Sequence, residues 1–120
     1  MKTSCFRKYK GDKGISIALY APSFWKGPSY PDLAPSRALL SAIKSKKIDH
    51  YEYEIIYKNE VLSKLDPLKV WIDLKGKVLL CWEMPGEFCH RRLVAEWLRD
   101  NINIDVPEWE EHKNENEPLF

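Results

Sequence analysis

Val78-Leu79-Leu80-Cys81-Trp82-Glu83-Met84-Pro85-Gly86-Glu87-Phe88-Cys89-His90-Arg91-Arg92 joins a short apolar run to a dense polar cluster. Residues 78–80 have the composition of a strand that is buried on both faces of a sheet, and residues 90–101 have the apolar periodicity of a helix. In open α/β sheets, ligands bind where the carboxyl ends of strands meet the amino ends of helices. The stretch therefore predicts a strand-to-helix junction that carries a functional site.

The rest of the chain predicts a small, mostly parallel α/β sheet flanked by helices. We expect strands near residues 15–20, 78–82 and 103–106, and helices near residues 36–47, 52–65, 67–74 and 90–101. Residues 52–65 are assigned to a helix because Tyr53, Tyr57, Val61 and Leu65 recur at every fourth position, which outweighs a short strand-like alternation at the start. We expect one domain with flexible polar ends at residues 1–14 and 108–120.

The composition is that of a globular protein. The chain has 120 residues and 44% hydrophobic content, and no stretch approaches the roughly 20 apolar residues of a membrane span. Its first residues carry positive charge without the apolar core of a secretory signal. Since three cysteines fit a disulfide scaffold poorly, we expect a cytoplasmic protein with reduced thiols and no membrane partner.

Charge is unevenly distributed along the chain although the net charge is only +1. Residues 1–80 hold 15 Lys and Arg against 8 Asp and Glu, whereas residues 81–120 hold 4 against 10. A nucleic-acid-binding protein more often shows an overall basic balance. The acidic end from Glu108 is interpreted as a solvated tail, with masking of the basic half as the alternative.

Three neighbouring side chains at the start of the last helix have different expected directions. At 100° per residue, His90 falls in the middle of the apolar face, Arg91 at its edge and Arg92 near its back, so the two arginines should not share a role. Basic residues in a first turn oppose the helix dipole and suggest an anionic partner. That partner is either an internal carboxylate, with Glu83, Glu87 and Glu96 as candidates, or a bound phosphate or carboxylate ligand.

The thiols at this junction allow several interpretations. Cys81 and Cys89 fit two small buried side chains. Alternatively, Cys89 is a nucleophile, because a helix amino terminus beside a cationic side chain lowers the pKa of a thiol. A zinc site of Cys81, Cys89 and His90 would need a fourth ligand from Cys5, His50, Glu83 or water, and the spacing is not a standard one, so we expect no metal. A phosphatase-type loop is excluded because no arginine lies six positions after either cysteine.

The same residues resemble the signature of the domain-of-unknown-function family 488. The resemblance rests on a Leu-Leu-Cys-x-Glu run at residues 79–83 followed by Cys-His-Arg at residues 89–91, in the compact branch that has Pro-Gly-Glu-Phe between them. Weaker agreement extends over roughly residues 15–100. The resemblance implies an α/β sandwich and marks Cys81, Glu83, Cys89, His90 and Arg91, but it implies no activity.

These observations lead to two functional hypotheses. The first is an anion-accepting pocket for a nucleotide or phosphorylated metabolite, in which Arg91 holds the anion and Cys89 is either a nucleophile or part of the polar lining. Glu83 and His90 would handle protons or orient Cys89, and Cys81 is a further candidate catalytic residue. The aromatic side chains of Tyr20, Trp25 and Tyr30 would form the walls. The second is a non-enzymatic nucleic-acid or protein-binding module, suggested by aromatic residues interleaved with lysine at residues 9–10 and 25–26. Oligomeric state is not predicted.

Overall fold

A computed structural model describes residues 1–83 and 88–111. In this part of the chain the strands β1 (Lys2–Cys5), β2 (Gly14–Ser16) and β3 (Val78–Cys81) form one parallel sheet in the order β1-β3-β2. The helices are α1 (Arg37–Lys44), α2 (His50–Glu60), α3 (Pro67–Leu74) and α4 (His90–Ile102), with short 3-10 turns η1 at Pro31–Leu33 and η2 at Leu62–Lys64. The predicted α/β class and parallel sheet are confirmed.

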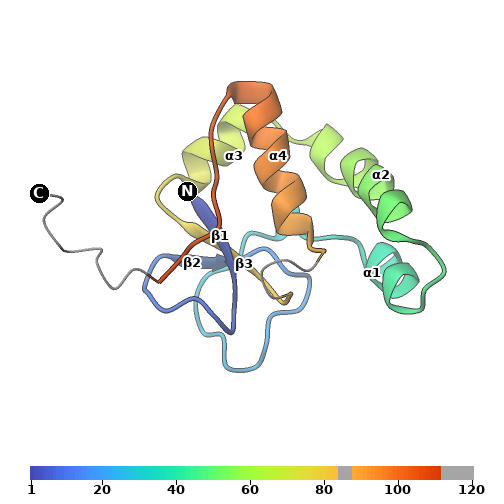
Figure 1. Cartoon of the computed structure of the whole chain (residues 1–120), viewed down its shortest axis with the longest axis horizontal. Helices are drawn as coiled ribbons and strands as arrows, with labels where there is room; N and C mark the ends of the chain where they lie inside the picture. Colours follow the sequence, from blue (N-terminus) through green and yellow to red (C-terminus); the bar gives the residue numbers. More distant parts are fainter. Residues whose placement is uncertain (84–87, 112–120) are drawn as a thin grey trace, which may run out of the picture.

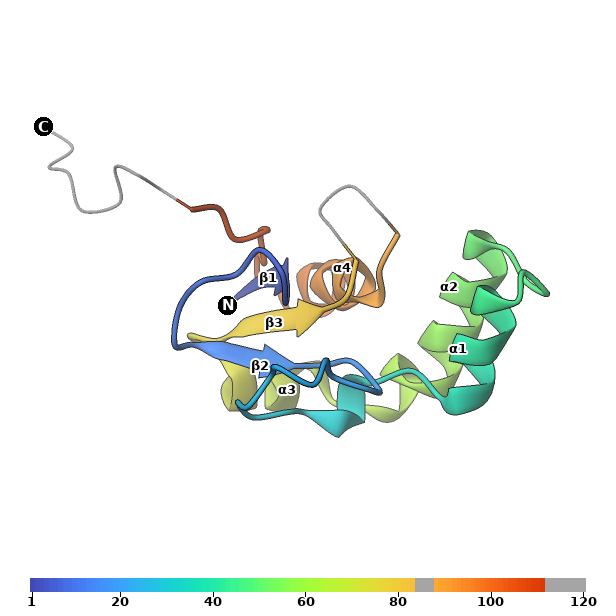
Figure 2. The same ribbon diagram turned by 90° about the horizontal axis from the view of Figure 1, so that it is seen from below.

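β3 is the central strand because apolar side chains cover both of its faces. Leu79 points into the larger core, where it joins residues of α2, α3 and α4. Val78 and Leu80 point the other way, into a second cluster with Phe6 and the partly buried Trp25. Figures 1 and 2 show α3 and α4 on one face of the sheet and the loops that follow β1 and β2 on the other.

α1 and α2 pack together at one end of the sheet, beyond the carboxyl end of β3 (Figure 2). The start of α2 is set by a capping box, in which Asp49 accepts from the backbone N–H of Glu52 and Glu52 accepts from that of Asp49. Tyr53 and Tyr57 are the buried residues of α2. The predicted helical periodicity is therefore confirmed, although α2 ends at Glu60 and the 3-10 turn η2 follows.

β1 was not predicted, because residues 1–14 read as a polar lead-in. Thr3, Ser4 and Cys5 are buried, and each residue of β1 pairs in register with a residue of β3. β2 is shorter than the strand expected at residues 15–20, since it ends at Ser16. Non-local pairing with β3 makes Lys2–Cys5 a strand despite its polar sequence.

The strand expected at residues 103–106 is wrong. Asn103 ends α4 in the left-handed conformation, with φ 57°, and the chain then returns alongside β1. There, within the described residues up to 111, it forms an isolated bridge between Glu108 and Thr3 and not a longer strand. The backbone N–H of Thr3 donates to Pro107 O at 3.0 Å and that of Trp109 to Thr3 O at 2.7 Å. Pro107 has no N–H to contribute to a ladder, which accounts for the short pairing.

No helix in residues 1–83 and 88–111 has the length and apolar content needed to cross a membrane. The expected flexible end at residues 108–120 lies mostly outside the described residues. Its first residue, Glu108, is held by the contacts described below.

Candidate functional site

A pocket of about 540 Å³ opens at the carboxyl end of β3. It lies between the end of β3, the start of α4, the segment after β2, and the α1–α2 pair. Its walls include Tyr20, Leu40, Lys44, His50, Tyr53, Cys81, Trp82, Glu83, Phe88, Cys89 and His90. The junction singled out by the sequence therefore faces a cavity at the position where α/β sheets bind ligands.

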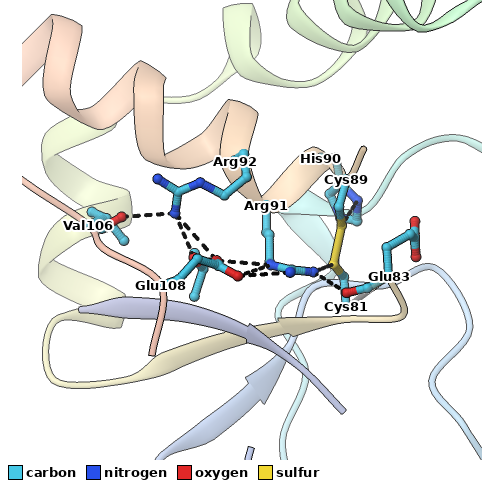
Figure 3. Close-up of polar contacts among 9 residues, drawn as sticks. Cys81, Glu83, Cys89, His90, Arg91, Arg92, Val106 and Glu108 are labelled. Atoms are coloured by element: carbon cyan, nitrogen blue, oxygen red, sulfur yellow. Dashed lines mark hydrogen bonds and ion pairs between the residues drawn. A yellow bond between two sulfur atoms is a disulfide. The ribbon is translucent and has the colours of Figure 1, made fainter. Parts of the chain in front are cut away.

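Cys81 and Cys89 are joined by a disulfide in this structure (Figure 3). Both cysteines are at most 2% exposed, and both line the pocket. Cys81 ends β3, and Cys89 is the N-cap residue of α4. The expectation of reduced thiols is thus corrected for this pair, while Cys5 lies outside the disulfide and is buried.

His90 points inward, as the helical phase predicts, and is only 6% exposed. Its Nε2 lies 2.9 Å from the carbonyl oxygen of Ile17, which can only accept, so Nε2 carries the proton and Nδ1 carries a lone pair. Nδ1 lies 3.9 Å from Cys89 Sγ. Burial lowers the pKa of His90 to about 4, despite the opposing hydrogen bond to Ile17, so the imidazole is neutral near pH 7.

Cys81 Sγ, Cys89 Sγ and His90 Nδ1 or Nε2 also meet the geometric requirement for a candidate metal cluster. Their ligand atoms lie within 4.8 Å of one another. Neither His50 nor Glu83 belongs to this group, although both line the pocket. The prediction of no metal stays a prediction.

Arg91 is the largest fully buried side chain among the described residues, at 1% exposure. Nη1 donates to Cys81 Sγ at 2.8 Å and to the carbonyl oxygen of Glu83 at 2.6 Å. Nη2 and Nε bind the carboxylate of Glu108 at 2.9 and 3.1 Å. Arg91 does not line the pocket, so its guanidinium is positioned to hold the protein together and not to hold an anion there.

Arg92 shares the same carboxylate, which corrects the prediction that the two arginines have separate roles. Its Nη1 lies 3.4 Å from Glu108 Oε2 and donates to Thr3 Oγ1 and Val106 O at 2.8 and 3.1 Å. Thr3 Oγ1 also donates to Glu108. Glu108 thus joins β1 to the first turn of α4, and it is not the start of a solvated tail (Figure 3).

The pKa of the Glu108 carboxylate is lower than that of an ordinary glutamate. Partial burial raises its pKa, but hydrogen bonds from Arg91 and Thr3 and the charges of both arginines outweigh burial and lower the pKa below its ordinary value. Sequence reasoning considered Glu83, Glu87 and Glu96 as partners and missed Glu108, which lies 17 residues after Arg91. Glu87 lies outside the described residues.

Glu83 faces the pocket instead of Arg91. Figure 3 shows its carboxylate turned away from the guanidinium, which donates to the backbone oxygen of Glu83. Burial, followed by the negative charge of Glu83, raises the pKa of Tyr53 in the same pocket. The predicted cluster of Cys81, Glu83, Cys89 and His90 is therefore brought together at one surface.

Only one of the three predicted aromatic wall residues lines the pocket. Tyr20 does so, and its hydroxyl accepts from Arg37 Nε at 3.0 Å. Trp25 packs against Phe6 on the other face of the sheet, with ring centroids 5.6 Å apart. Tyr30 binds Asp73 at 2.7 Å. Tyr53, Trp82, Phe88 and His50 supply the aromatic walls in their place.

The hint of a nucleic-acid surface at residues 9–10 and 25–26 is weakened by these contacts. Tyr9 packs edge-on against Trp109 at 5.0 Å, and Trp25 belongs to the second apolar cluster. Aromatic rings engaged in this way present less free face for stacking on bases.

A protein-family model matches most of the chain. The family model is DUF488-N3a, described as the active DUF488-N3 subclade, and it matches residues 6–102. No curated protein and no solved structure matches the chain significantly. Because the match spans the sheet's central strand, the pocket and the whole of α4, the chain belongs to the DUF488 family, in its N3 subclade.

Proposed function

We propose that this protein binds a small molecule with a planar ring, of nucleotide type, in the pocket at the carboxyl end of β3. The observation that carries the proposal is that the motif residues Cys81, Glu83, Cys89 and His90 all line one cavity. Its volume of about 540 Å³ lies within the range of small-molecule sites. Aromatic walls with a few polar groups are the usual lining of such sites.

The anionic part of the ligand is assigned to α1 and not to Arg91. Lys44 lines the main pocket and also a neighbouring one of about 440 Å³, which Arg37 and Ser41 line as well. Tyr20 and Leu40 belong to both pockets, so the two are adjacent. A ring held between aromatic side chains would therefore place a phosphate near Lys44 and Arg37.

Thiol chemistry is part of the same proposal. When the cysteines are reduced, Cys89 is the nucleophile, and its thiol faces the lone pair of His90 Nδ1 at 3.9 Å. Glu83 adds a carboxylate at the edge of the pocket. The description of the matching subclade as active supports an enzyme, without naming a reaction. We also propose that the protein is cytoplasmic, as expected from the sequence.

The test is a titration of the full chain with adenosine, AMP and ribose 5-phosphate, followed by tryptophan fluorescence, since Trp82 lines the pocket. Tyr20→Ala should weaken both ring-bearing ligands about five-fold or more, through lost stacking. Lys44→Ala should weaken AMP about five-fold and leave adenosine unchanged, because it removes one charge-assisted contact.

Lys47→Ala is the matched control, since Lys47 is an exposed lysine just after α1 that does not line the pocket. It should bind all three ligands as the wild type does. If none of the ligands binds below about 1 mM, or if Tyr20→Ala and Lys44→Ala bind as the control does, the proposal is wrong.

A further inference from the structure

The contacts around the Cys81–Cys89 disulfide fit its reduced form better than its oxidised form. Arg91 Nη1 donates to Cys81 Sγ at 2.8 Å in a fully buried position (Figure 3). A disulfide sulfur is a weak acceptor, whereas a thiolate is a full negative charge that a guanidinium stabilises strongly. The guanidinium would therefore stabilise a thiolate on Cys81 more strongly than it stabilises the disulfide.

The second cysteine has a matching arrangement. The hydrogen bond from Nε2 to Ile17 O leaves a lone pair on Nδ1 of His90, 3.9 Å from Cys89 Sγ. A disulfide offers no S–H to this lone pair, but a thiol on Cys89 does. The two polar neighbours therefore differ: a donor faces Cys81 and an acceptor faces Cys89.

We propose that Cys81 and Cys89 form a redox-active pair that undergoes thiol–disulfide exchange with a low-molecular-mass thiol entering through the pocket. Both cysteines line that pocket, which is the route by which we expect the reductant to reach them. The inference deepens the thiol part of the proposed function, because reduction produces the Cys89 nucleophile. It rests on the proposed function only in using the same pocket.

The exchange proceeds in two steps. A thiolate of the reductant attacks Cys89 Sγ, the disulfide bond breaks, and its electron pair leaves on Cys81, where Arg91 stabilises the thiolate. A second reductant thiolate then attacks the sulfur of the mixed disulfide that belongs to the reductant. This releases Cys89, which takes a proton and becomes a thiol facing His90, and it releases the oxidised reductant. Two electrons move from two reductant thiols to the protein.

Arg91 favours Cys81 as the leaving group because its buried guanidinium is held against that sulfur. Its other nitrogens bind Glu108, which holds the guanidinium in place and balances its charge. Arg92 binds the same carboxylate, and none of its hydrogen bonds among the described residues goes to a sulfur. This difference supplies a matched control.

The first experiment maps the direction of attack. Oxidised full-length protein carrying Cys5→Ser is mixed with excess glutathione, quenched with a fast alkylating reagent, and analysed by peptide mass spectrometry. Glutathione should be found on Cys89 and the alkyl group on Cys81. Glutathione on Cys81 would overturn the assigned direction, and failure to reduce the pair in the folded protein would overturn the whole proposal.

The second experiment measures the redox equilibrium in buffers of reduced and oxidised glutathione. Arg91→Lys should make the pair harder to reduce by about ten-fold, which is about 30 mV for two electrons, whereas Arg92→Lys should leave it within about two-fold of the wild type. If Arg91→Lys does not fold, the mapping experiment still decides the proposal. A pair that stays fully reduced in excess oxidised glutathione, or that is purified with one zinc ion per chain held by both sulfurs, would contradict it.

These outcomes are independent of ligand binding. Redox exchange without binding of the nucleotide panel would contradict the proposed function and leave the redox pair standing. Binding of AMP by a protein whose disulfide does not react would support the proposed function and contradict the redox pair.

Discussion

Arg91 binds Glu108 through two nitrogens, Nη2 at 2.9 Å and Nε at 3.1 Å, with the guanidinium 1% exposed and the carboxylate side chain 27% exposed. The ion pair fastens the segment after α4 to the first turn of that helix and, through Thr3, to β1. It also fixes the guanidinium against Cys81 (Figure 3). A carboxylate outside the predicted motif therefore positions an arginine within it.

Replacing Glu108 should destabilise the protein. Glu108→Gln removes the negative charge and leaves a buried guanidinium uncompensated, which we expect to cost about 2–3 kcal/mol, somewhat less than for a wholly buried pair. The free energy of unfolding in urea checks this value. Glu110→Gln, at an exposed position two residues on, should change it by less than about 0.5 kcal/mol. Equal effects of the two substitutions would mean that the ion pair contributes nothing.

Stability should fall as the pH drops from about 6.5 to about 4. The pKa of His90 is lowered to about 4 by burial, so the unfolded chain binds a proton in this window that the folded protein does not. The stabilisation is therefore complete above about pH 6.5 and is lost towards pH 4, by an amount on the order of 3 kcal/mol. Unfolding free energies measured at half-unit intervals of pH test this.

His90→Phe is the informative variant for that pH dependence. It should be less stable at pH 7, because the carbonyl of Ile17 loses its donor. Its stability should nevertheless vary much less between pH 6.5 and 4.5. An unchanged slope in this variant would show that other groups cause the pH dependence. The lowered pKa of Glu108 acts in the same direction: its contribution to the free energy of unfolding is lost at lower pH, as the carboxylate becomes protonated.

The hydroxyl of Tyr57 should contribute to stability. It donates to the carbonyl oxygen of Leu33 at 2.6 Å inside the core, and Tyr57→Phe leaves this buried acceptor unsatisfied. We expect a loss of about 1–2 kcal/mol in the free energy of unfolding. Tyr51→Phe, at a side chain that is 71% exposed on the same helix, should have no measurable effect. A loss as large at residue 51 would point to a general effect on α2.

The capping box of α2 should matter for the pocket as well as for the helix. Asp49→Ala removes the acceptor for the N–H of Glu52, at a cost of about 1 kcal/mol. Because His50 opens the helix and lines the pocket, the variant should also weaken AMP binding by two-fold or more. Glu54→Ala removes only an exposed ion pair with Lys58 and should leave binding unchanged. If both variants bind AMP more weakly, the loss of binding is not caused by the loss of the helix cap.

Local pattern determined much of the architecture. The apolar run Val78–Leu80 predicts the central strand, and local sequence signals predict the four α-helices, although α2 ends at Glu60 and not at residue 65. The inward direction of His90 follows from helical phase alone, since a helix turns by a constant angle per residue. Likewise, a strand-to-helix junction suffices to predict that Cys81, Glu83, Cys89 and His90 gather at one edge of the sheet.

Tertiary structure decided what local pattern does not encode. Lys2–Cys5 became a strand because β3 offers a pairing partner 76 residues away in register, although its sequence is polar. Arg91 pairs with Glu108, and Trp25 packs against Phe6 and not in the pocket. Neither contact could be predicted locally, because side chains far apart in the chain meet only after folding. An arginine that is buried without an opposite charge is strongly destabilising, and its pairing with Glu108 depends on the path of the backbone after α4.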